Sequence, residues 1–216
     1  MTPAQQRQFD AISAELNRLI RYDDESVVHE HWIRQRYDGG YAQTYRPART
    51  AAVETAWHEA GHAVAALVTG ARFSSASIRH SATSAGRVHA ITTGGSEAFV
   101  IHAAGQIAER LRGWTTLDDD AGLTAWLRTW RDDGGDAKHF RDTIKPRSGT
   151  AAEVAAWRYA ERVLTPHRPQ IRHLARALLV YPRYLPYEVS KALYRASLYQ
   201  AGNASSESRT TSAPAR

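Results

Sequence analysis

The chain has 216 residues, of which 43% are hydrophobic, and this is enough for one domain with a genuine core and short appendages. It contains no cysteine, which excludes disulfide bonds and thiolate-bound metals, and its 28 Lys and Arg against 22 Asp and Glu give a formal charge of only +6. Without a signal-peptide pattern or about 18 consecutive apolar residues, the sequence predicts a cytoplasmic protein with no membrane association, and nucleic-acid binding is not favoured.

The amino-terminal part, residues 1–49, is expected to hold a helix and a linker. Residues 3–21 carry apolar side chains at helical spacing, which predicts an amphipathic helix packed on the domain or on a second copy. The rest mixes charge with Tyr and is predicted to be irregular, apart from a short helix at 27–36. His29 and His31 lie two positions apart, a spacing that does not converge on a helix, so solvated or core histidines are the simpler interpretation.

The next segment, residues 51–69, is rich in Ala and Val, contains no Pro and is followed by Gly70, all of which predicts one helix. His58 and His62 are four positions apart and would project from the same face, where two imidazoles can bind one zinc ion. Glu59 lies at the edge of that face, where a carboxylate can accept a proton from a metal-activated water. A structural histidine pair on a half-buried helix is the competing interpretation.

Gly61 inside this helix indicates close approach by another backbone, because Gly costs about 1 kcal/mol against Ala in a helix interior. Residues 71–92 contain two short strand candidates around a turn, a small hairpin whose edge would hold a substrate backbone. His80 and His89 there are interpreted as surface or core residues. Residues 97–112 then carry an apolar face and should form a helix packed on the first one.

Acidic residues at 118–120 open a helix expected at 119–130, where they would cap free amides and complement the helix dipole. Metal ligation is about as good an interpretation for each of them, and Glu109 is a rival ligand from the preceding helix. The polar segment 132–143 is predicted to be a loop or lid. Asp136 and His139 in it are candidates for substrate contact, although a solvated loop is the simpler interpretation.

Three further helices are predicted near the carboxyl terminus. They cover residues 151–165, the apolar stripe from Ile171 to Leu179, and a last helix that carries Val189, Leu193 and Leu198. Beyond residue 200 the Ser, Ala and Thr-rich tail has nothing to bury and is expected to be disordered. The expected organisation is an amino-terminal helix and linker at 1–49, a mainly helical α+β domain at 50–200, and a tail at 201–216.

The predicted helix contains the run Trp57-His58-Glu59-Ala60-Gly61-His62. This run resembles the active-site helix of the FtsH-type ATP-dependent zinc proteases, in which an aromatic residue precedes His-Glu-Ala-Gly-His. Further similarities follow in order over residues 50–195. They are the hairpin strand that begins with Gly86, the run Ala104-Gly105-Gln106-Ile107-Ala108-Glu109-Arg110-Leu111, the pair Thr115-Thr116 before the aspartates, and the closing helices from Ala160 to Leu179. The resemblance implies a stand-alone zinc peptidase domain with a small hairpin beside the metal helix.

The same resemblance implies that an aspartate after the Thr-Thr pair is the third zinc ligand. Aligned without a gap, that position falls on Ala121, so a turn shorter by one residue is required, which favours Asp120 with Asp119 second. Glu109 ranks below both, because its neighbours resemble a structural segment. The expected zinc site is therefore His58, His62 and Asp120, with Glu59 as the catalytic residue. The chain also departs from the family, since it has no Gly-Lys dipeptide and hence no Walker-type phosphate loop.

These observations predict a zinc-dependent endopeptidase that hydrolyses peptide bonds in peptides or in unfolded and flexible protein segments without an ATPase of its own. A separate ATPase or unfoldase is a possible partner, as is a second copy of the chain. One alternative is a zinc peptidase dedicated to cutting one regulatory protein. Another is a peptidase fold retained as a binding or adaptor protein with little or no catalysis, against which the intact Glu59 argues.

Overall fold

The computed structural model describes residues 1–19, 49–78, 86–89, 91, 97–113, 119–130, 135–144, 149–181 and 184–210. The described part is mainly helical, with one small antiparallel sheet, as the sequence predicts. The short helix expected at 27–36, with His29 and His31, lies outside the described residues, as do His80, the turn after it, Thr115, Thr116 and Asp118.

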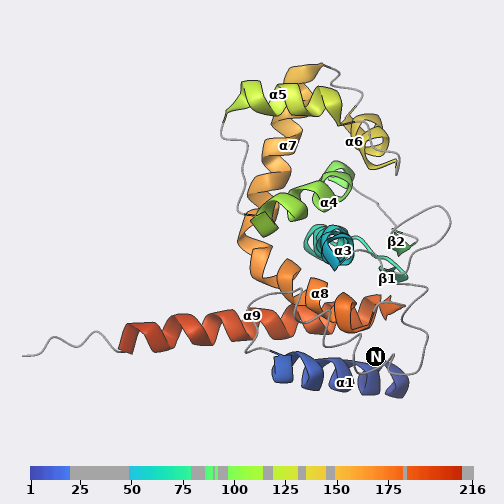
Figure 1. Cartoon of the computed structure of the whole chain (residues 1–216), viewed down its shortest axis with the longest axis vertical. Coiled ribbons are helices and arrows are strands. Elements are labelled where there is room, and N and C mark those ends of the chain that lie inside the picture. Colours follow the sequence, from blue (N-terminus) through green and yellow to red (C-terminus); the bar gives the residue numbers. More distant parts are fainter. Residues whose placement is uncertain are drawn as a thin grey trace, which may run out of the picture.

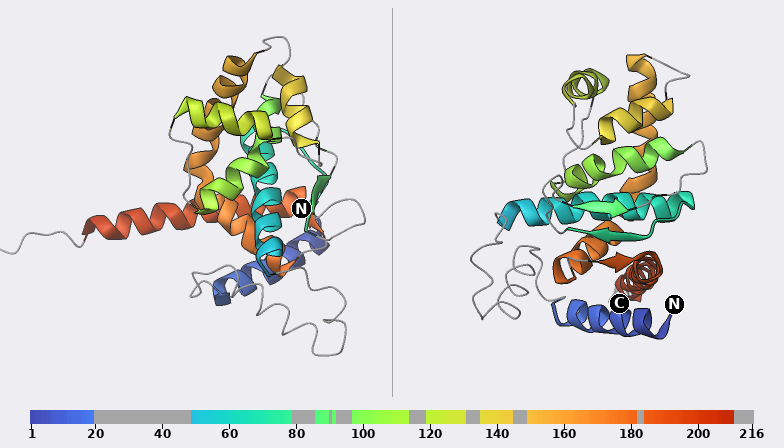
Figure 2. Two further views of the ribbon diagram at one scale, coloured as in Figure 1. Left: turned by 45° about the horizontal axis from the view of Figure 1, so that its top comes forward. Right: turned by 90° about the vertical axis from the view of Figure 1, so that its right-hand side faces the viewer.

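Helix α3 (Arg49–Thr69) is the central element, and the other helices pack around it. Helix α4 (Ala98–Gly113) lies on one side of α3, and α8 (Arg168–Val180) with α9 (Tyr187–Thr210) lies on the other (Figures 1 and 2). The core formed by these helices includes the fully buried side chains Ala56, Trp57, Ala60, Val64, Ile101, Ile107, Leu174, Leu178, Val189 and Leu193. The metal-ligand candidates on α3 therefore lie at the middle of the molecule.

The composition of α3 explains why it can be surrounded. Small Ala and Val residues occupy most of its positions from Ala52 to Ala66, so neighbouring helices approach closely on several faces. The helix ends where Gly70 adopts a φ of 76°, the left-handed conformation that Gly accepts most readily after a helix. The predicted helix and its predicted end are both confirmed.

The sheet has the strand order β2-β1-β3. Strands β1 (Ser75–Ser77) and β2 (Arg87–His89) form the predicted antiparallel hairpin, with Ala76 opposite Val88. Strand β3 (Leu185–Pro186) pairs with the other side of β1 and was not expected from the sequence. Pro is tolerated there because β3 lies at the edge of the sheet, where a missing N–H leaves no ladder partner unpaired.

The remaining helices agree with prediction except at one place. Helices α5 (Asp120–Thr129) and α7 (Thr150–Leu164) lie where they were expected, and α7 continues through a short 3-10 turn (Thr165–His167) into α8. The segment predicted as a loop or lid instead contains helix α6 (Asp136–Ile144), which packs on α4 and α7. It buries Ala137 and Phe140, three positions apart on one face of the helix.

The first and last described helices lie on the α8 side of α3. Helix α1 (Pro3–Leu19) begins with a capping box, because the Thr2 hydroxyl accepts from the Gln5 N–H and the Gln5 side chain accepts from the Thr2 N–H. It packs on α8 and α9 through the apolar face that the sequence predicts. Helix α9 projects beyond the other helices (Figure 1). It continues to Thr210, so the expected boundary at residue 200 lies inside it, and residues 211–216 lie outside the described part.

Two glycines set the distance between α3 and α4. A Cβ on Gly61 would lie 2.6 Å from the Ala108 Cβ and would also collide with the backbone carbonyl of Ala104. A Cβ on Gly105 would collide with the Cε1 and Nε2 atoms of the His58 ring and would lie 2.7 Å from its Cδ2 atom. The prediction that Gly61 permits close approach by another backbone is confirmed. Gly105 on α4 in turn leaves room for the His58 ring on α3.

We expect Gly61→Ala to lower the free energy of unfolding by about 1–3 kcal/mol, although Ala favours a helix by about 1 kcal/mol, because the added methyl forces two packed backbones apart. The matched control is Gly122→Ala on α5, where the added Cβ would meet only the flexible side chain of Asp119. Urea unfolding of both variants measures the difference. An equal or higher midpoint for Gly61→Ala would contradict the packing argument.

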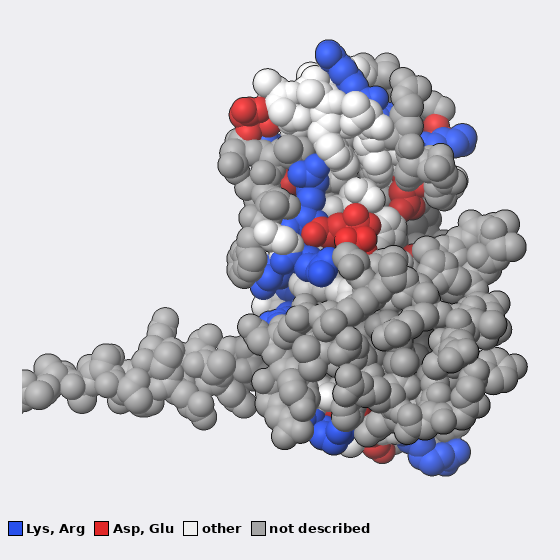
Figure 3. Space-filling model, in the orientation of Figure 1, with Lys and Arg blue, Asp and Glu red and all other residues white. Residues whose placement is uncertain are grey.

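Every helix in the described part of the chain is too short or too polar to cross a bilayer. On the face shown in Figure 3, basic and acidic side chains of the described residues are interspersed.

Candidate metal centre

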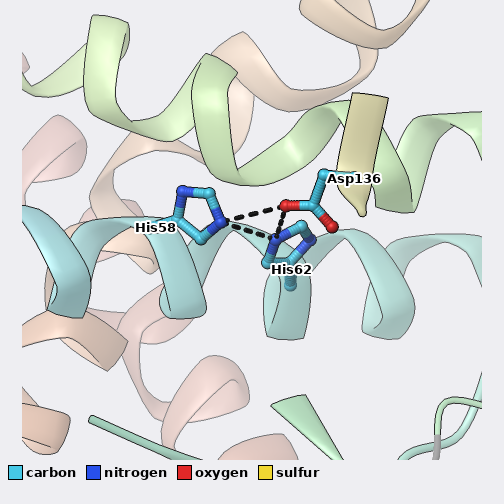
Figure 4. Close-up of side chains that lie close together, drawn as sticks. All are labelled: His58, His62 and Asp136. Carbon is cyan, nitrogen blue, oxygen red and sulfur yellow. Dashed lines mark hydrogen bonds and ion pairs between the residues drawn. The ribbon is translucent and has the colours of Figure 1, made fainter. Parts of the chain in front are cut away.

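Three side chains from two helices converge beside α4. His58 and His62 project from the same side of α3, and Asp136 reaches them from the first turn of α6 (Figure 4). The two Nε2 atoms are 3.0 Å apart, and Asp136 Oδ2 lies 3.1 Å from each of them. These three atoms form a nearly equilateral triangle, so one ion could contact all of them.

The outward nitrogens of both imidazoles are held by α4. His62 Nδ1 donates to the backbone carbonyl of Ile101 at 2.7 Å, and His58 Nδ1 donates to Glu109 Oε1 at 2.7 Å. A carbonyl or carboxylate oxygen can only accept, so these partners assign the ring hydrogen to Nδ1 in both neutral imidazoles. The Nε2 lone pairs then face the shared point. Carbonyl and carboxylate partners of this kind orient histidine ligands in metal sites.

The arrangement fits a zinc ion by its donor chemistry. Two imidazole lone pairs and a carboxylate oxygen repel one another at 3.0–3.1 Å unless positive charge lies among them. Ligands of a tetrahedral zinc at 2.0–2.1 Å are about 3.3 Å apart, so only a small outward movement of the three atoms is needed. Two His and one Asp leave a fourth position for water or substrate, as in catalytic zinc sites.

The pKa values of the group point in the same direction. Burial lowers the pKa of His58, but hydrogen bonds to Asp136 and Glu109 outweigh it and raise the pKa to about 10. Burial also opposes protonation of His62, yet the Asp136 charge raises its pKa above the ordinary value. Burial raises the pKa of Asp136, but the His62 charge and hydrogen bonds from both imidazoles hold it well below its usual range. These hydrogen bonds to Asp136 require a proton on Nε2, and a metal ion bound there would take the place of that proton, so the charge of Asp136 favours a cation at the centre.

Glu59 occupies the opposite flank of the centre, next to strand β2. Its side chain is buried, and a Cβ on Gly86 would lie 2.8 Å from the Glu59 Cγ. Burial raises the pKa of the Glu59 carboxyl, against the opposing charges of His62 and His58 and a hydrogen bond from the Val88 backbone. Glu59 is thus a buried carboxylate with an increased proton affinity beside two imidazoles, which is the property that a general base requires.

The structure does not place Asp120, the expected third ligand, with the histidines. Asp120 lies at the start of α5, where its exposed carboxylate is 3.1 Å from Arg158 Nε. Asp119 is the amino-terminal cap of α5, with its side chain bonded to the Gly122 N–H, so the capping interpretation is confirmed for this residue.

Glu109, the rival ligand, contacts the outer nitrogen of His58. The third member of the group is instead Asp136, which the sequence indicated only as a candidate for substrate contact.

One sequence signal for Asp136 was available. Phe140 is four positions after Asp136 and Ala137 follows it directly, a short apolar spacing that fits one or two helical turns starting at an acidic residue. The adjacent glycines and charged residues favoured a loop instead. No local pattern, however, indicates that the start of this helix meets the histidines of α3, which are more than 70 positions away in the chain.

One comparison with known proteins matches a part of the chain that includes His58, Glu59 and His62. The model of the Peptidase M50B-like family matches residues 40–117, which include α3, the β1–β2 hairpin and α4. The match covers less than half of the chain and ends before Asp136. It is not to the FtsH-type proteases, so it supports the broader peptidase resemblance but not the narrower one. No curated protein matches the chain.

Proposed function

We propose that the protein is a zinc-dependent endopeptidase with His58, His62 and Asp136 as zinc ligands and Glu59 as the catalytic carboxylate. The observation that carries the proposal is the convergence of three ligand atoms within 4.8 Å of one another, next to a buried glutamate on the same helix. The similarity of residues 40–117 to Peptidase M50B-like proteins supports a metallopeptidase. Asp136 replaces Asp120 in this proposal because its carboxylate faces both imidazoles.

Each of these groups has a separate role in the proposed hydrolysis of a peptide bond. Zinc, when bound, would polarise the scissile carbonyl and lower the pKa of water to about 7. Glu59 would take the proton from the attacking water and pass it to the leaving amine, so no covalent intermediate with the protein is needed. Ile101 and Glu109 would keep both imidazoles oriented through their outer nitrogens.

The hairpin supplies a place for the substrate backbone. Strand β2 is an edge of the sheet among the described residues, and the Val88 backbone bonds to Glu59, so the strand runs beside the catalytic carboxylate. An extended peptide that adds to this edge would pass the metal centre with its backbone in a fixed register. Flexible peptides and unfolded segments fit such a mode, because only an extended chain can pair with a strand.

Metal content tests the proposal most directly. We expect about one zinc ion per purified wild-type chain and close to none in His58→Ala, because the variant loses one of three donors. The matched control is His167→Ala, whose imidazole contacts Tyr194 in another part of the molecule and should leave the zinc content unchanged. Elemental analysis after dialysis gives the result. Wild-type protein with no metal, or with iron in place of zinc, would contradict the proposal.

Two alternatives share the metal centre and differ in how it is used. A peptidase dedicated to one regulatory protein would cleave that protein but not unstructured casein. A binding or adaptor protein with the same fold would take up zinc and cleave neither. Delivery of substrates by a separate ATPase, and self-association, are further proposals that the same digestions can address by adding the partner or varying the protein concentration.

A further inference from the structure

Two additional histidines lie beside the metal centre as a contacting pair. His102 is on α4 and His139 is on α6, and their ring centroids are 5.2 Å apart with the ring planes inclined by 30°. The sequence pattern did not connect them, since they are 37 positions apart in the chain (139 − 102). The fold therefore brings four imidazoles, in two pairs, to the region where α3, α4 and α6 meet.

The backbone ties this second pair to the ligands. His102 directly follows Ile101, whose carbonyl accepts the hydrogen bond from His62. His139 lies in the same first turn of α6 as Asp136, and its backbone N–H bonds to the Gly135 carbonyl at 2.8 Å. Gly135 has a φ of 92°. A Cβ added to Gly135 would lie 3.5 Å from the Cδ2 and Nε2 atoms of His139, which is an ordinary contact distance. The backbones of His102 and His139 are thus placed next to groups that belong to the metal centre.

The two rings differ in their surroundings. His102 is half-buried, and burial together with the neighbouring His139 lowers its pKa to about 4, although Asp136 acts in the opposite direction. His102 is therefore neutral near pH 7. His139 is exposed. Within the described residues neither imidazole forms a hydrogen bond with another group, so their N–H donors are available.

We propose that His139 donates a hydrogen bond from its imidazole N–H to the carbonyl oxygen of the scissile peptide bond, and that His102 positions the His139 ring by packing against it. This inference rests on the proposed function. As water adds to the carbonyl carbon, negative charge develops on the carbonyl oxygen, and a fixed donor stabilises that charge more than it stabilises the uncharged substrate. Even a neutral imidazole carries one N–H, so the role requires no change of protonation.

The test compares His139→Ala, His139→Gln, His102→Phe and His102→Ala in zinc-loaded protein, with a fluorogenic peptide selected from a library digested by the wild type. Removing one such donor typically costs about 10²–10³-fold in kcat, so we expect that loss for His139→Ala with a much smaller change in KM. His139→Gln keeps a donor and should recover part of the rate. His102→Phe keeps a ring for packing and should retain most of it, whereas His102→Ala should not.

Zinc content and thermal unfolding of each variant are measured in parallel, and His167→Ala again serves as the histidine control. A zinc-loaded His139→Ala variant with the wild-type kcat, while Glu59→Gln is inactive, overturns this inference and leaves the proposed function intact. Loss of zinc from His139→Ala also overturns it, because that result assigns His139 to the metal. A wild type that binds zinc but cleaves no peptide overturns both proposals.

Discussion

Glu59→Gln is expected to abolish peptide hydrolysis while the protein keeps its zinc. The amide has nearly the shape of the carboxylate but cannot accept the proton of the attacking water, and general-base catalysis of this kind contributes about 10²–10⁴-fold in rate. The proposed ligands His58, His62 and Asp136 are unchanged in this variant, so the metal content should stay near one per chain. Digestion of labelled casein and of a peptide library by both proteins measures the loss.

The chain offers a close control for this substitution. Glu54 lies on the same helix, but its side chain is 53% exposed and faces Arg112 across 3.8 Å. Glu54→Gln removes the same charge from α3 at a distance from the centre and should leave the rate within about two-fold of wild type, because exposed ion pairs contribute little. Full activity of Glu59→Gln would refute the role that we assign to this residue.

Asp136→Ala should weaken zinc binding by at least about 100-fold, whereas Asp120→Ala should leave it unchanged. The first variant removes one of three converging donors, and even groups that only support a ligand typically change metal affinity by 10–100-fold. The second removes an exposed ion pair with Arg158, whose expected contribution to stability is at most about 1 kcal/mol. Competition with a chromogenic zinc chelator gives both affinities.

The outcome of this pair decides between two assignments of the third ligand. The resemblance to FtsH-type proteases favoured Asp120 by its position after a Thr-Thr pair, and the geometry favours Asp136 by its distance of 3.1 Å from both Nε2 atoms. If Asp120→Ala lost zinc and Asp136→Ala retained it, the assignment from the structure would be wrong. Loss of activity alone would not distinguish the two, which is why affinity is the quantity to measure.

The central helix was predictable because its evidence is local. The spacing of His58 and His62, the apolar composition around them and the stop at Gly70 all lie within one continuous segment. Gly61 was informative for the same reason, since a glycine in a strong helix has a cost that some contact must offset. The hairpin followed from two short strand patterns separated by a turn, and its position beside the metal helix agrees with prediction.

The third member of the centre was not predictable from the sequence, because it depends on how distant helices pack. Asp118, Asp119 and Asp120 have the same residue type and a helix-start position similar to that of Asp136, so composition cannot choose among them. The choice is made by α6, which buries Phe140 and Ala137 while it packs on α4 and α7 and thereby directs Asp136 toward α3. Strand β3 was not predicted for a similar reason, because its two residues pair with β1, which lies far earlier in the chain.

The origin of the ligands on two different helices has a consequence for stability. The pair α3–α4 is held together by direct contact at its glycines, but α6 is a helix of only nine residues that contributes one proposed ligand. An ion shared by α3 and α6 would act as a cross-link between distant parts of the sequence. The free energy of zinc binding would then be, in part, the free energy that keeps α6 docked. In such a protein the concentration of free zinc would determine how stably α6 stays packed beside the two histidines of α3.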